Sequence, residues 1–407
     1  MDKLELLSPA GDLEKLKTAV DYGADAVYFG GELFSLRAGA GNLSIEQMKE
    51  AVQYAHAHHV KCYLALNIFA HNEDVLPLED YLLKIKALEI DAFIVSDPGI
   101  MLMIRAVMPD AEIHLSTQAN MTNYKTAQFW KNQGVKRIVL ARELTFDEIR
   151  HLRAQQPDLE LEAFVQGAMC ISYSGRCLLS NFMIERDANR GQCAHPCRWK
   201  YALVEEQRPG EYYPIEEDER GTYILNSRDL CMIDHIPDLV EAGIASAKIE
   251  GRMKSSFYVA TVVGAYRKAI DAYYQDPAGY EFRKEWMDEL KKVSHREFTT
   301  GFYYNQPTNQ DQNYQTSAYT RNYSFIGVVK DYDPQTGMAI VEQRNKMTVG
   351  EEIEVFGPHT DFFKQTLEVL LDEEGNAIES APHPQQILQI KMEHPVSANF
   401  MLRKRKE

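Results

Sequence analysis

The sequence predicts an α/β protein built on a (β/α)8 barrel of the TIM type, followed by a small β-barrel-like domain. Eight short runs rich in Val, Ile and Leu alternate with amphipathic stretches of helical period over the first 255 residues. These runs have the composition of strands buried on both faces, as a parallel barrel requires. No glycine-rich dinucleotide fingerprint follows the first run, so a closed barrel is favoured over an open doubly wound sheet.

The predicted barrel elements follow one another in a regular order along the chain. The predicted strands lie near Leu4, Val27, Leu64, Ile94, Ile113, Val139, Phe164 and Ile249. Gly23 suits the end of the first helix, because glycine readily adopts the left-handed conformation found there. Ser44 with Gln47, and Thr145 with Glu148, have the spacing of capping boxes that begin two later helices.

The barrel unit is expected to span residues 1–304, including helices near 258–274 and 281–292. Between its seventh and eighth strands, residues 170–243 form an insertion rich in Cys, Arg, Gly and Pro. Loops after barrel strands build active sites, so this insertion is expected to be functional. Residues 305–322 are predicted to be a linker or loop, and the alternating pattern of 323–407 predicts a small β domain.

The composition limits the classes of partner. There are 44 basic and 60 acidic residues, and the formal charge of −16 disfavours indiscriminate binding to polyanions. Any contact with a nucleic acid must therefore use a local basic patch. No apolar segment approaches the length of a membrane span, and the first residues lack the pattern of a secretory signal. We expect a cytoplasmic protein that does not enter a membrane.

Four cysteines of the insertion form the strongest candidate metal site: Cys170, Cys177, Cys193 and Cys231. Thiolates are soft ligands that select zinc or an iron–sulfur centre. The wide gaps between these cysteines disfavour a zinc finger, so an iron–sulfur cluster is preferred. Cys197, with His195 beside it, is the alternative ligand, and a third interpretation is that all are buried or free thiols. Cys62 is expected to be a core residue.

Charged residues at the end of the eighth predicted strand form a second candidate site. Lys248, Glu250, Arg252 and Lys254 occur in the segment KIEGRMKS. Barrel enzymes bind phosphates and carboxylates at this position, so an anion clamp is one interpretation. The other is a structural ion pair of Lys248 with Glu250 or Glu162.

Polar residues at other strand ends are further candidates: Asn67, His114, Gln118, Arg142 and Gln166. His114 and Glu250 are the candidate catalytic residues, because both can transfer a proton, although a lone histidine is more often an interior side chain. Arg176, next to Cys177, could bind substrate, tune a cluster by its charge, or simply be solvated.

The segment EAFVQGAMCISYSGRCLLS, residues 162–180, closely resembles the signature of the bacterial collagenase-like peptidase family. LSPAGD near the start, KIEGRMKS, and HREFTTGFYYN from His295 also resemble that family, and the resemblance covers nearly the whole chain. Within the family the chain is most similar to members that take part in making 5-hydroxyuridine at the wobble position of tRNA. The resemblance implies a four-iron, four-sulfur cluster on Cys170, Cys177, Cys193 and Cys231.

The resemblance also implies that prephenate, rather than oxygen, is the source of the hydroxyl group. Arg252 and Lys254 would suit this dicarboxylate. An unpaired anticodon-loop uridine could stack on an aromatic ring such as Tyr173, Phe302 or Tyr303. RNA contact is expected at basic stretches such as residues 248–254 or 403–406.

Two other functions remain open. One is a peptidase of the collagenase-like type, although the sequence has no HExxH pair and no GxSxG elbow. The other is an accessory or scaffold subunit with a structural cluster, in a homo-oligomer or in a hetero-oligomer with a paralogous family member that performs the catalysis.

Overall fold

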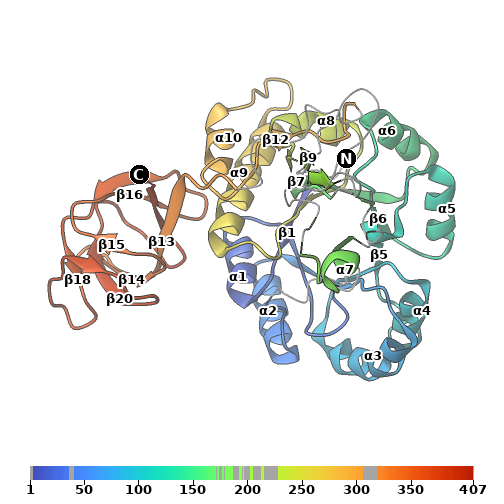
Figure 1. Ribbon diagram of the computed structural model, residues 1–407, viewed down its shortest axis with the longest axis horizontal. Helices are drawn as coiled ribbons and strands as arrows, with labels where there is room; N and C mark the ends of the chain where they lie inside the picture. The colour runs from blue at the N-terminus through green and yellow to red at the C-terminus, as the bar shows by residue number, and fades with distance from the viewer. Residues whose placement is uncertain are drawn as a thin grey trace.

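The computed structural model describes residues 3–35, 41–170, 172–173, 177, 179–186, 192–194, 196, 202–204, 212–214, 228–305 and 319–406. In this part of the chain a helix-covered barrel lies beside a smaller β domain (Figure 1). The barrel strands are β1 Glu5–Pro9, β2 Ala26–Phe29, β3 Lys61–Leu66, β4 Ala92–Val95, β5 Ile113–Leu115, β6 Arg137–Val139, β7 Glu160–Ala168 and β11 Ser246–Ile249. Neighbouring strands are parallel, and β11 pairs with both β7 and β1, which closes the ring. The predicted barrel is confirmed.

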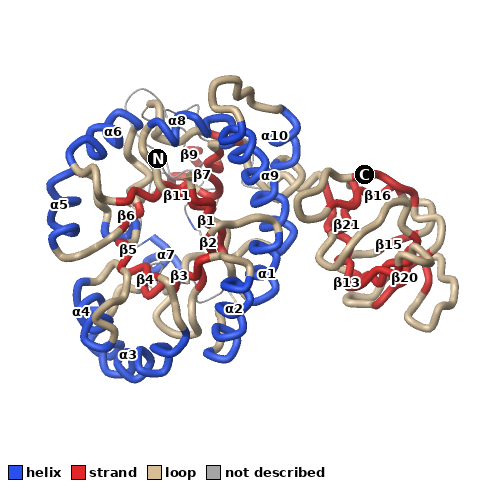
Figure 2. The backbone as a smooth tube through the Cα atoms, turned by 180° about the vertical axis from the view of Figure 1, so that it is seen from behind, coloured by secondary structure: helices blue, strands red, loops and turns tan. Residues whose placement is uncertain are grey.

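Helices surround the barrel (Figure 2). They are α1 Leu13–Asp21, α2 Ile45–Ala57, α3 Asn72–Ile85, α4 Pro98–Val107, α5 Tyr124–Asn132, α6 Phe146–Gln155, α8 Ile236–Glu241, α9 Ser256–Gln275 and α10 Lys284–Leu290, with 3-10 turns η1 Lys86–Leu88, η2 Thr117–Ala119 and η5 Ile233–His235. Both predicted capping boxes are present, and Gly23 follows α1 with a φ of +100°. Local sequence signals therefore begin and end these helices as expected.

Strand β7 continues beyond the barrel and carries an unpredicted addition. Its last residues pair antiparallel with β10, Asp229–Cys231, which pairs in turn with β12, Phe298–Thr299. Cys231 therefore lies in a strand, opposite Gln166. The described parts of the insertion also form α7, Leu179–Ile184, and a short ladder of β8, Ala202–Val204, with β9, Tyr212–Pro214.

The barrel interior is apolar on one side and charged on the other. Its apolar side is a buried cluster from the first four strands: Leu7, Ala26, Tyr28, Tyr63, Ala65, Ala92 and Ile94. On the other side, Glu162, Lys248 and Arg137 point inward and are almost fully buried. Because a buried charge is costly unless it is paired, these three side chains are expected to form ion pairs with one another.

The second domain is a curled antiparallel sheet, with strand order β17-β16-β21-β13-β14-β20-β18 among the described residues. Its strands are β13 Tyr323–Asp333, β14 Met338–Gln343, β16 Glu352–Phe356, β17 Phe363–Thr366, β18 Leu370–Leu371, β20 Ile387–Lys391 and β21 Met401–Arg405, beside the pair β15 Met347–Thr348 and β19 Ser380–Ala381. The hairpin of β13 and β14 turns at Gly337, which has a φ of +71°. The predicted small β domain is therefore present.

A buried ion network joins the β domain to the barrel. Arg403 of β21 is fully buried, and its guanidinium nitrogens lie 2.7 and 2.9 Å from the two carboxylate oxygens of Glu289 on α10. Its Nε donates to Glu354 of β16 at 2.8 Å. Phe257 of α9 stacks on Phe325 of β13 with 5.4 Å between ring centroids. These contacts fix the β domain against α9 and α10.

Within the described part of the chain, no helix combines the length and apolarity needed to cross a lipid bilayer.

Candidate active site

Lys248 of β11 and Glu162 of β7 form an ion pair inside the barrel. Lys248 Nζ lies 2.6 Å from Glu162 Oε1, and the side chains are 5% and 0% exposed. On the other side of Glu162, Arg137 contacts that carboxylate as well as Glu5 and Glu160. Burial lowers the pKa of Lys248, although the Glu162 carboxylate opposes this shift. The sequence left open whether Lys248 belongs to an anion clamp or to a structural ion pair, and these contacts show the ion pair with Glu162.

Glu250 lies where β11 reaches the carboxyl end of the barrel, next to Tyr28 of β2. The Tyr28 hydroxyl donates to the Ile249 carbonyl at 2.9 Å and lies 3.4 Å from Glu250 Oε2. Lys248 Nζ lies 4.2 Å from the centroid of the Tyr28 ring. The mouth therefore combines a half-buried carboxylate, a phenol and, one layer below, an ammonium group. A carboxylate in this setting can accept a proton from a bound substrate.

Arg252 lies at the same end of the barrel, close to the loop that follows β2. Its Nη1 donates to Ser35 Oγ at 2.7 Å, and the residue is 4% exposed. A Cβ added at Gly30 would lie 2.6 Å from this nitrogen, so a glycine is needed for the guanidinium to come so close. Arg252 is thus a positioned cation of the kind that binds carboxylates.

Lys254 belongs to a neighbouring cluster that includes the HREF segment. Its Nζ lies 4.0 Å from the centroid of the Tyr319 ring, and the guanidinium carbon of Arg296 lies 4.1 Å from the same centroid. The backbone N–H of Arg296 donates to the buried carboxylate of Asp229 at 3.1 Å. This cationic and aromatic cluster connects the end of β11 with the entry to the β domain.

The remaining polar candidates are not all brought to the mouth. His114 is fully buried, with its Nε2 2.9 Å from Glu112 Oε1 and its ring against Tyr63. Glu112 precedes β5, so this ring is directed to the amino end of the barrel, away from Glu250. Gln166 is buried, and its Oε1 accepts from Tyr266 of α9 at 3.1 Å.

The other strand-end candidates follow their strands directly. Asn67 is half-buried after β3, and Gln118 is buried in η2 after β5. Arg142, after β6, donates to the Ala168 carbonyl at 2.6 Å and lies 4.1 Å from the centroid of the Phe164 ring. Arg142 therefore helps to hold the end of β7 at the mouth. Arg176, Cys197 and His195 lie outside the described residues.

The four candidate ligand cysteines are all described. Cys170 is exposed directly after β7, Cys177 and Cys193 are partly buried, and Cys231 is 3% exposed. Burial raises the pKa of Cys231 to about 12, and the hydroxyl of Tyr266 contacts its thiol. Among the described residues, no three or more His, Cys, Asp or Glu side chains are grouped to hold a metal ion. The set of four cysteine ligands therefore stays a prediction from the sequence.

The structure separates the aromatic candidates for base stacking. Tyr173 is 47% exposed. Tyr303 is 6% exposed, packs on Phe146 and donates its hydroxyl hydrogen bond to the Phe164 carbonyl at 2.6 Å. Tyr303 is therefore a core residue that a base cannot stack on, contrary to the expectation from the sequence. Phe302 is half-buried.

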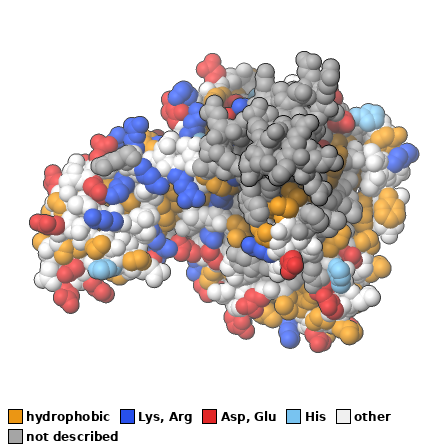
Figure 3. Space-filling view, viewed as in Figure 1, with side chains coloured by type: hydrophobic (Ala, Val, Ile, Leu, Met, Phe, Trp, Pro, Cys, Tyr) orange, Lys and Arg blue, Asp and Glu red, His pale blue; other side chains and the backbone are white. Residues whose placement is uncertain are grey.

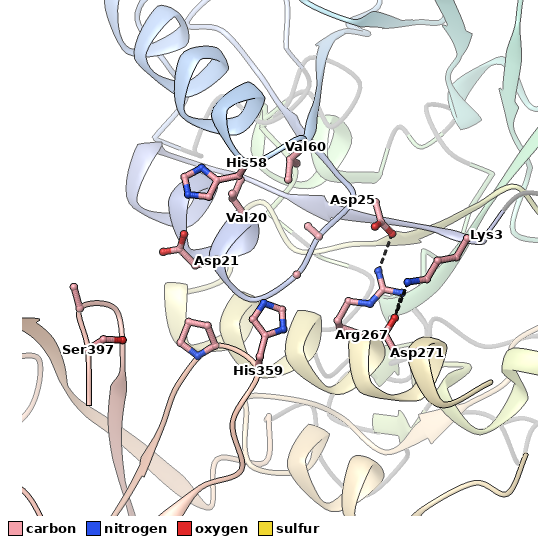
Figure 4. A pocket seen from close by; sticks show the side chains of 14 residues that line it. Lys3, Val20, Asp21, Asp25, His58, Val60, Arg267, Asp271, His359 and Ser397 are labelled. Carbon is pink, nitrogen blue, oxygen red and sulfur yellow. Dashed lines mark hydrogen bonds and ion pairs between the residues drawn. The ribbon is translucent and has the colours of Figure 1, made fainter. Parts of the chain in front are cut away.

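A cavity of about 690 Å³ lies elsewhere, at the junction of the barrel and the β domain (Figure 4). Its wall includes Lys3 and Val60, which precede β1 and β3, so it lies at the amino end of the barrel. Arg267 pairs there with Asp271 at 2.8 Å, and Lys3 pairs with the same carboxylate at 2.7 Å. This cavity is distinct from the mouth that carries Glu250.

Sequence reasoning did not single out Tyr28, Ser35 or the pair Asp229 and Arg296. Tyr28 could have been found, because it lies two residues after Ala26 on an apolar strand and so faces the same side. Ser35 contacts Arg252, which is 217 residues away in the sequence, and Asp229 contacts Arg296, which is 67 residues away. No local pattern signals such contacts.

Comparison with known proteins identifies what the chain is similar to. The profile of Peptidase family U32 matches residues 11–313, and that of the Peptidase family U32 C-terminal domain matches 321–403. The tRNA hydroxylation protein P1 of Bacillus subtilis is 45% identical, covering 99% of this chain and 95% of that protein. The tRNA hydroxylation protein P of Escherichia coli is 36% identical over 99% and 96%. A protein of Porphyromonas gingivalis named collagenase is 31% identical over 90% of each chain.

Proposed function

Because the chain belongs to Peptidase family U32, and relatives named for tRNA hydroxylation align with nearly its whole length, we propose that it is an RNA-hydroxylating enzyme acting on tRNA. The observation that carries this proposal is the alignment with tRNA hydroxylation protein P1, which extends over both domains. The polar mouth of the barrel supports an enzyme, because it gathers a carboxylate, a phenol and cations from distant strands.

In its finer form, the proposal is that the chain takes part in converting the wobble uridine of tRNA to 5-hydroxyuridine, with prephenate and without oxygen. Uridine in an anticodon loop is unpaired and can be turned out into a pocket. Prephenate carries two carboxylates, and Arg252 and Lys254 lie at the end of β11 where they could bind them.

Glu250 has the best position for a proton acceptor in this reaction. Replacing the hydrogen on C5 of uridine by a hydroxyl group is a two-electron oxidation that releases a proton, and in this proposal prephenate both gives the hydroxyl group and accepts the two electrons. The Glu250 carboxylate is half-buried beside the Tyr28 hydroxyl, where it can accept the proton. His114 is a weaker candidate, because its ring is enclosed and directed toward Glu112. Glu250→Gln is expected to remove most 5-hydroxyuridine while the protein stays folded. Unchanged 5-hydroxyuridine in that variant would exclude Glu250 from the reaction.

We also propose a four-iron, four-sulfur cluster, on the strength of the cysteine pattern and the family resemblance. Cys231 lies in β10 opposite Gln166 of β7, so this ligand would be supplied from a strand and the other three from the segment that follows β7. Iron and sulfide analysis of anaerobically purified protein tests the cluster. Cys170→Ala should lose the iron and the 5-hydroxyuridine, whereas Cys62→Ala, the matched control inside β3, should keep both.

Deletion of the gene followed by mass spectrometry of tRNA nucleosides tests the function as a whole. We expect 5-hydroxyuridine to disappear, and prephenate with the purified protein to restore it on tRNA from the deletion strain. Loss without restoration would favour the accessory or scaffold function, in which a paralogous partner performs the catalysis. Normal tRNA in the deletion strain would refute the proposal.

The similarity to a protein named collagenase keeps a peptidase as the second candidate function. This function predicts hydrolysis of collagen-like peptides by protein that contains no iron. Burial raises the pKa of both Cys62 and Cys231 to about 12, so these two thiols are protonated and are poor nucleophiles.

A further inference from the structure

Exposed basic side chains gather around the end of the last strand of the β domain. The basic patch consists of Arg321, Lys346, Arg405 and Lys406, all of which are exposed. Tyr323 pairs with Arg405 across β13 and β21, and the Lys406 N–H donates to the Asn322 carbonyl at 2.8 Å. Figure 3 shows several Lys and Arg side chains on the face of the β domain that is turned toward the viewer.

Among the residues that the structure describes, the basic patch differs from the neighbouring basic side chains in having no acidic partner. Arg403 is buried between Glu289 and Glu354, so the expectation that it contacts RNA is wrong. Lys404 lies 2.7 Å from Glu351, and Arg344 pairs with Glu14 and Glu342. Among the described residues, none of the four side chains of the patch has an ion-pair partner. On a chain of net charge −16, such a group produces a local positive potential.

The patch is held in a fixed position relative to the barrel mouth. Arg321 comes two residues after Tyr319, whose ring contacts Lys254 and Arg296 at the end of β11. Thr320 is bound to His295 by backbone hydrogen bonds of 2.8 and 3.3 Å. The buried contacts of Arg403 with Glu289 hold the other strand that carries the patch. Basic side chains therefore lie in sequence from the mouth of the barrel, at Lys254 and Arg296, to the basic patch of the β domain, and hydrogen bonds and ion pairs hold the segments that carry them.

From this arrangement we infer that the basic patch binds the phosphate backbone of the RNA whose base enters the barrel mouth. The inference rests on the proposed function and adds the surface that holds the substrate. Exposed Lys and Arg side chains neutralise phosphates and release counterions, so they supply affinity without reading sequence. Because the chain as a whole has a net charge of −16, a polyanion is favoured at a local basic patch over other parts of the surface.

The test compares two variants that lose the same charge. In the patch variant, Arg321, Lys346, Arg405 and Lys406 are all replaced by Gln. The control variant carries Gln at exposed lysines on α2, α3, η1 and α5, namely Lys49, Lys84, Lys86 and Lys125. Binding of an unmodified tRNA transcript is measured by fluorescence anisotropy between roughly 50 and 200 mM KCl, the range over which phosphate contacts change affinity most clearly. Far-UV circular dichroism checks that both variants are folded.

We expect the patch variant to lower the slope of log Kd against log salt concentration by about 3, since each phosphate contact contributes about 0.7 to 0.9. Its loss of affinity at low salt is expected to be at least about tenfold, and the control should bind as the wild type does. Equal slopes for the wild type and the patch variant, an equal loss in the control, or no tRNA binding by the wild type would overturn the inference.

Complementation of the deletion strain separates this inference from the proposed function. If the wild-type gene restores 5-hydroxyuridine and the patch variant restores it fully at equal protein level, the patch is not the substrate surface and the function stands. If deletion leaves 5-hydroxyuridine unchanged, the proposed function fails. Tight binding of the patch to an acidic protein or to anionic vesicles, without binding to tRNA, would identify another partner and refute the RNA surface.

Discussion

Replacing Lys248 by Met tests whether this residue acts chiefly as a buried ion-pair partner. Methionine has nearly the length and volume of lysine but no charge, so the substitution removes the 2.6 Å contact with Glu162 and leaves little cavity. Glu162 is fully buried and, among the described residues, would keep the more distant ion pair with Arg137 at 3.4 Å. Breaking a buried pair costs about 3–5 kcal/mol. Because Arg137 remains, we expect a loss of about 3 kcal/mol in the free energy of unfolding.

Urea denaturation followed by far-UV circular dichroism measures this loss, using the transition of the barrel. The variant with both Lys248→Met and Glu162→Met should be less destabilised than the sum of the single variants, by about 2 kcal/mol, because the second substitution removes the uncompensated charge. Lys49→Met, at an exposed lysine of α2, is the matched control, and a change of less than about 1 kcal/mol is expected there.

The result that would refute this reasoning is a Lys248→Met protein of wild-type stability. If that protein lost less than about 1 kcal/mol, the Coulombic contact would be too weak to account for the buried charges. A simultaneous rise in the prephenate concentration needed for half-maximal activity would then favour the anion clamp. Additive single and double variants would also argue against a direct coupling of Lys248 with Glu162.

Three further predictions concern the domain junction and the mouth. Arg403→Met should lower the free energy of unfolding by about 3 kcal/mol in urea denaturation, because Glu289 and Glu354 lose a buried partner. Arg405→Met, at an exposed residue, is the control and should change this free energy by less than about 0.5 kcal/mol. If Arg403→Met changed it no more than the control does, the ion network would not hold the domains together. Burial alone would raise the pKa of Glu354, but the hydrogen bond from Lys292 and the charge of Arg403 lower this pKa overall. The ionised Glu354 therefore stabilises the folded protein above the ordinary carboxyl pKa, and this contribution is lost as the pH falls through the lowered pKa. Unfolding measured from about pH 5 to pH 3 should therefore show a shallower decline for Glu354→Gln than for the wild type, and equal slopes would contradict the assigned shift. Gly30→Ala would place a Cβ 2.2 Å from Ser35 Oγ and 2.6 Å from Arg252 Nη1, so the amount of 5-hydroxyuridine in tRNA should fall sharply. Gly264→Ala is the control, because its Cβ would meet Tyr22 at an ordinary 3.5 Å, and it should leave the amount normal. A normal amount of 5-hydroxyuridine in both variants would mean that Arg252 is not part of the site.

Much of the barrel could be predicted because its signals are local. A strand buried on both faces needs a run of apolar residues, and the capping boxes at Ser44 and Thr145 are complete within four residues. The same is true of Gly337 in the hairpin turn of the β domain. Strand β10 was not predicted, because it lies inside the insertion, outside the strand and helix alternation of the barrel, and pairs antiparallel with the distant end of β7.

The candidate site could be predicted only in part. Residues 248–254 were found, because charged side chains at the end of an apolar strand are unusual. The different roles of Lys248, which is paired inside the barrel, and Arg252, which is held by Ser35, could not be separated. Arg403 was expected at the RNA surface, since four consecutive basic residues look alike in a sequence although one of them is buried.

The sequence by itself determined which segments become strands and helices, and which residues have the chemistry for a site, because hydrophobic period, caps and side-chain type act over a few neighbouring positions. Only the tertiary structure decided which of those groups meet. Closing the ring brought Lys248 against Glu162 and Tyr28 beside Glu250, and docking of the β domain enclosed Arg403 while leaving Arg405 exposed. Pairing and burial of this kind depend on contacts between residues far apart in the chain, and they set the free energy of each charge.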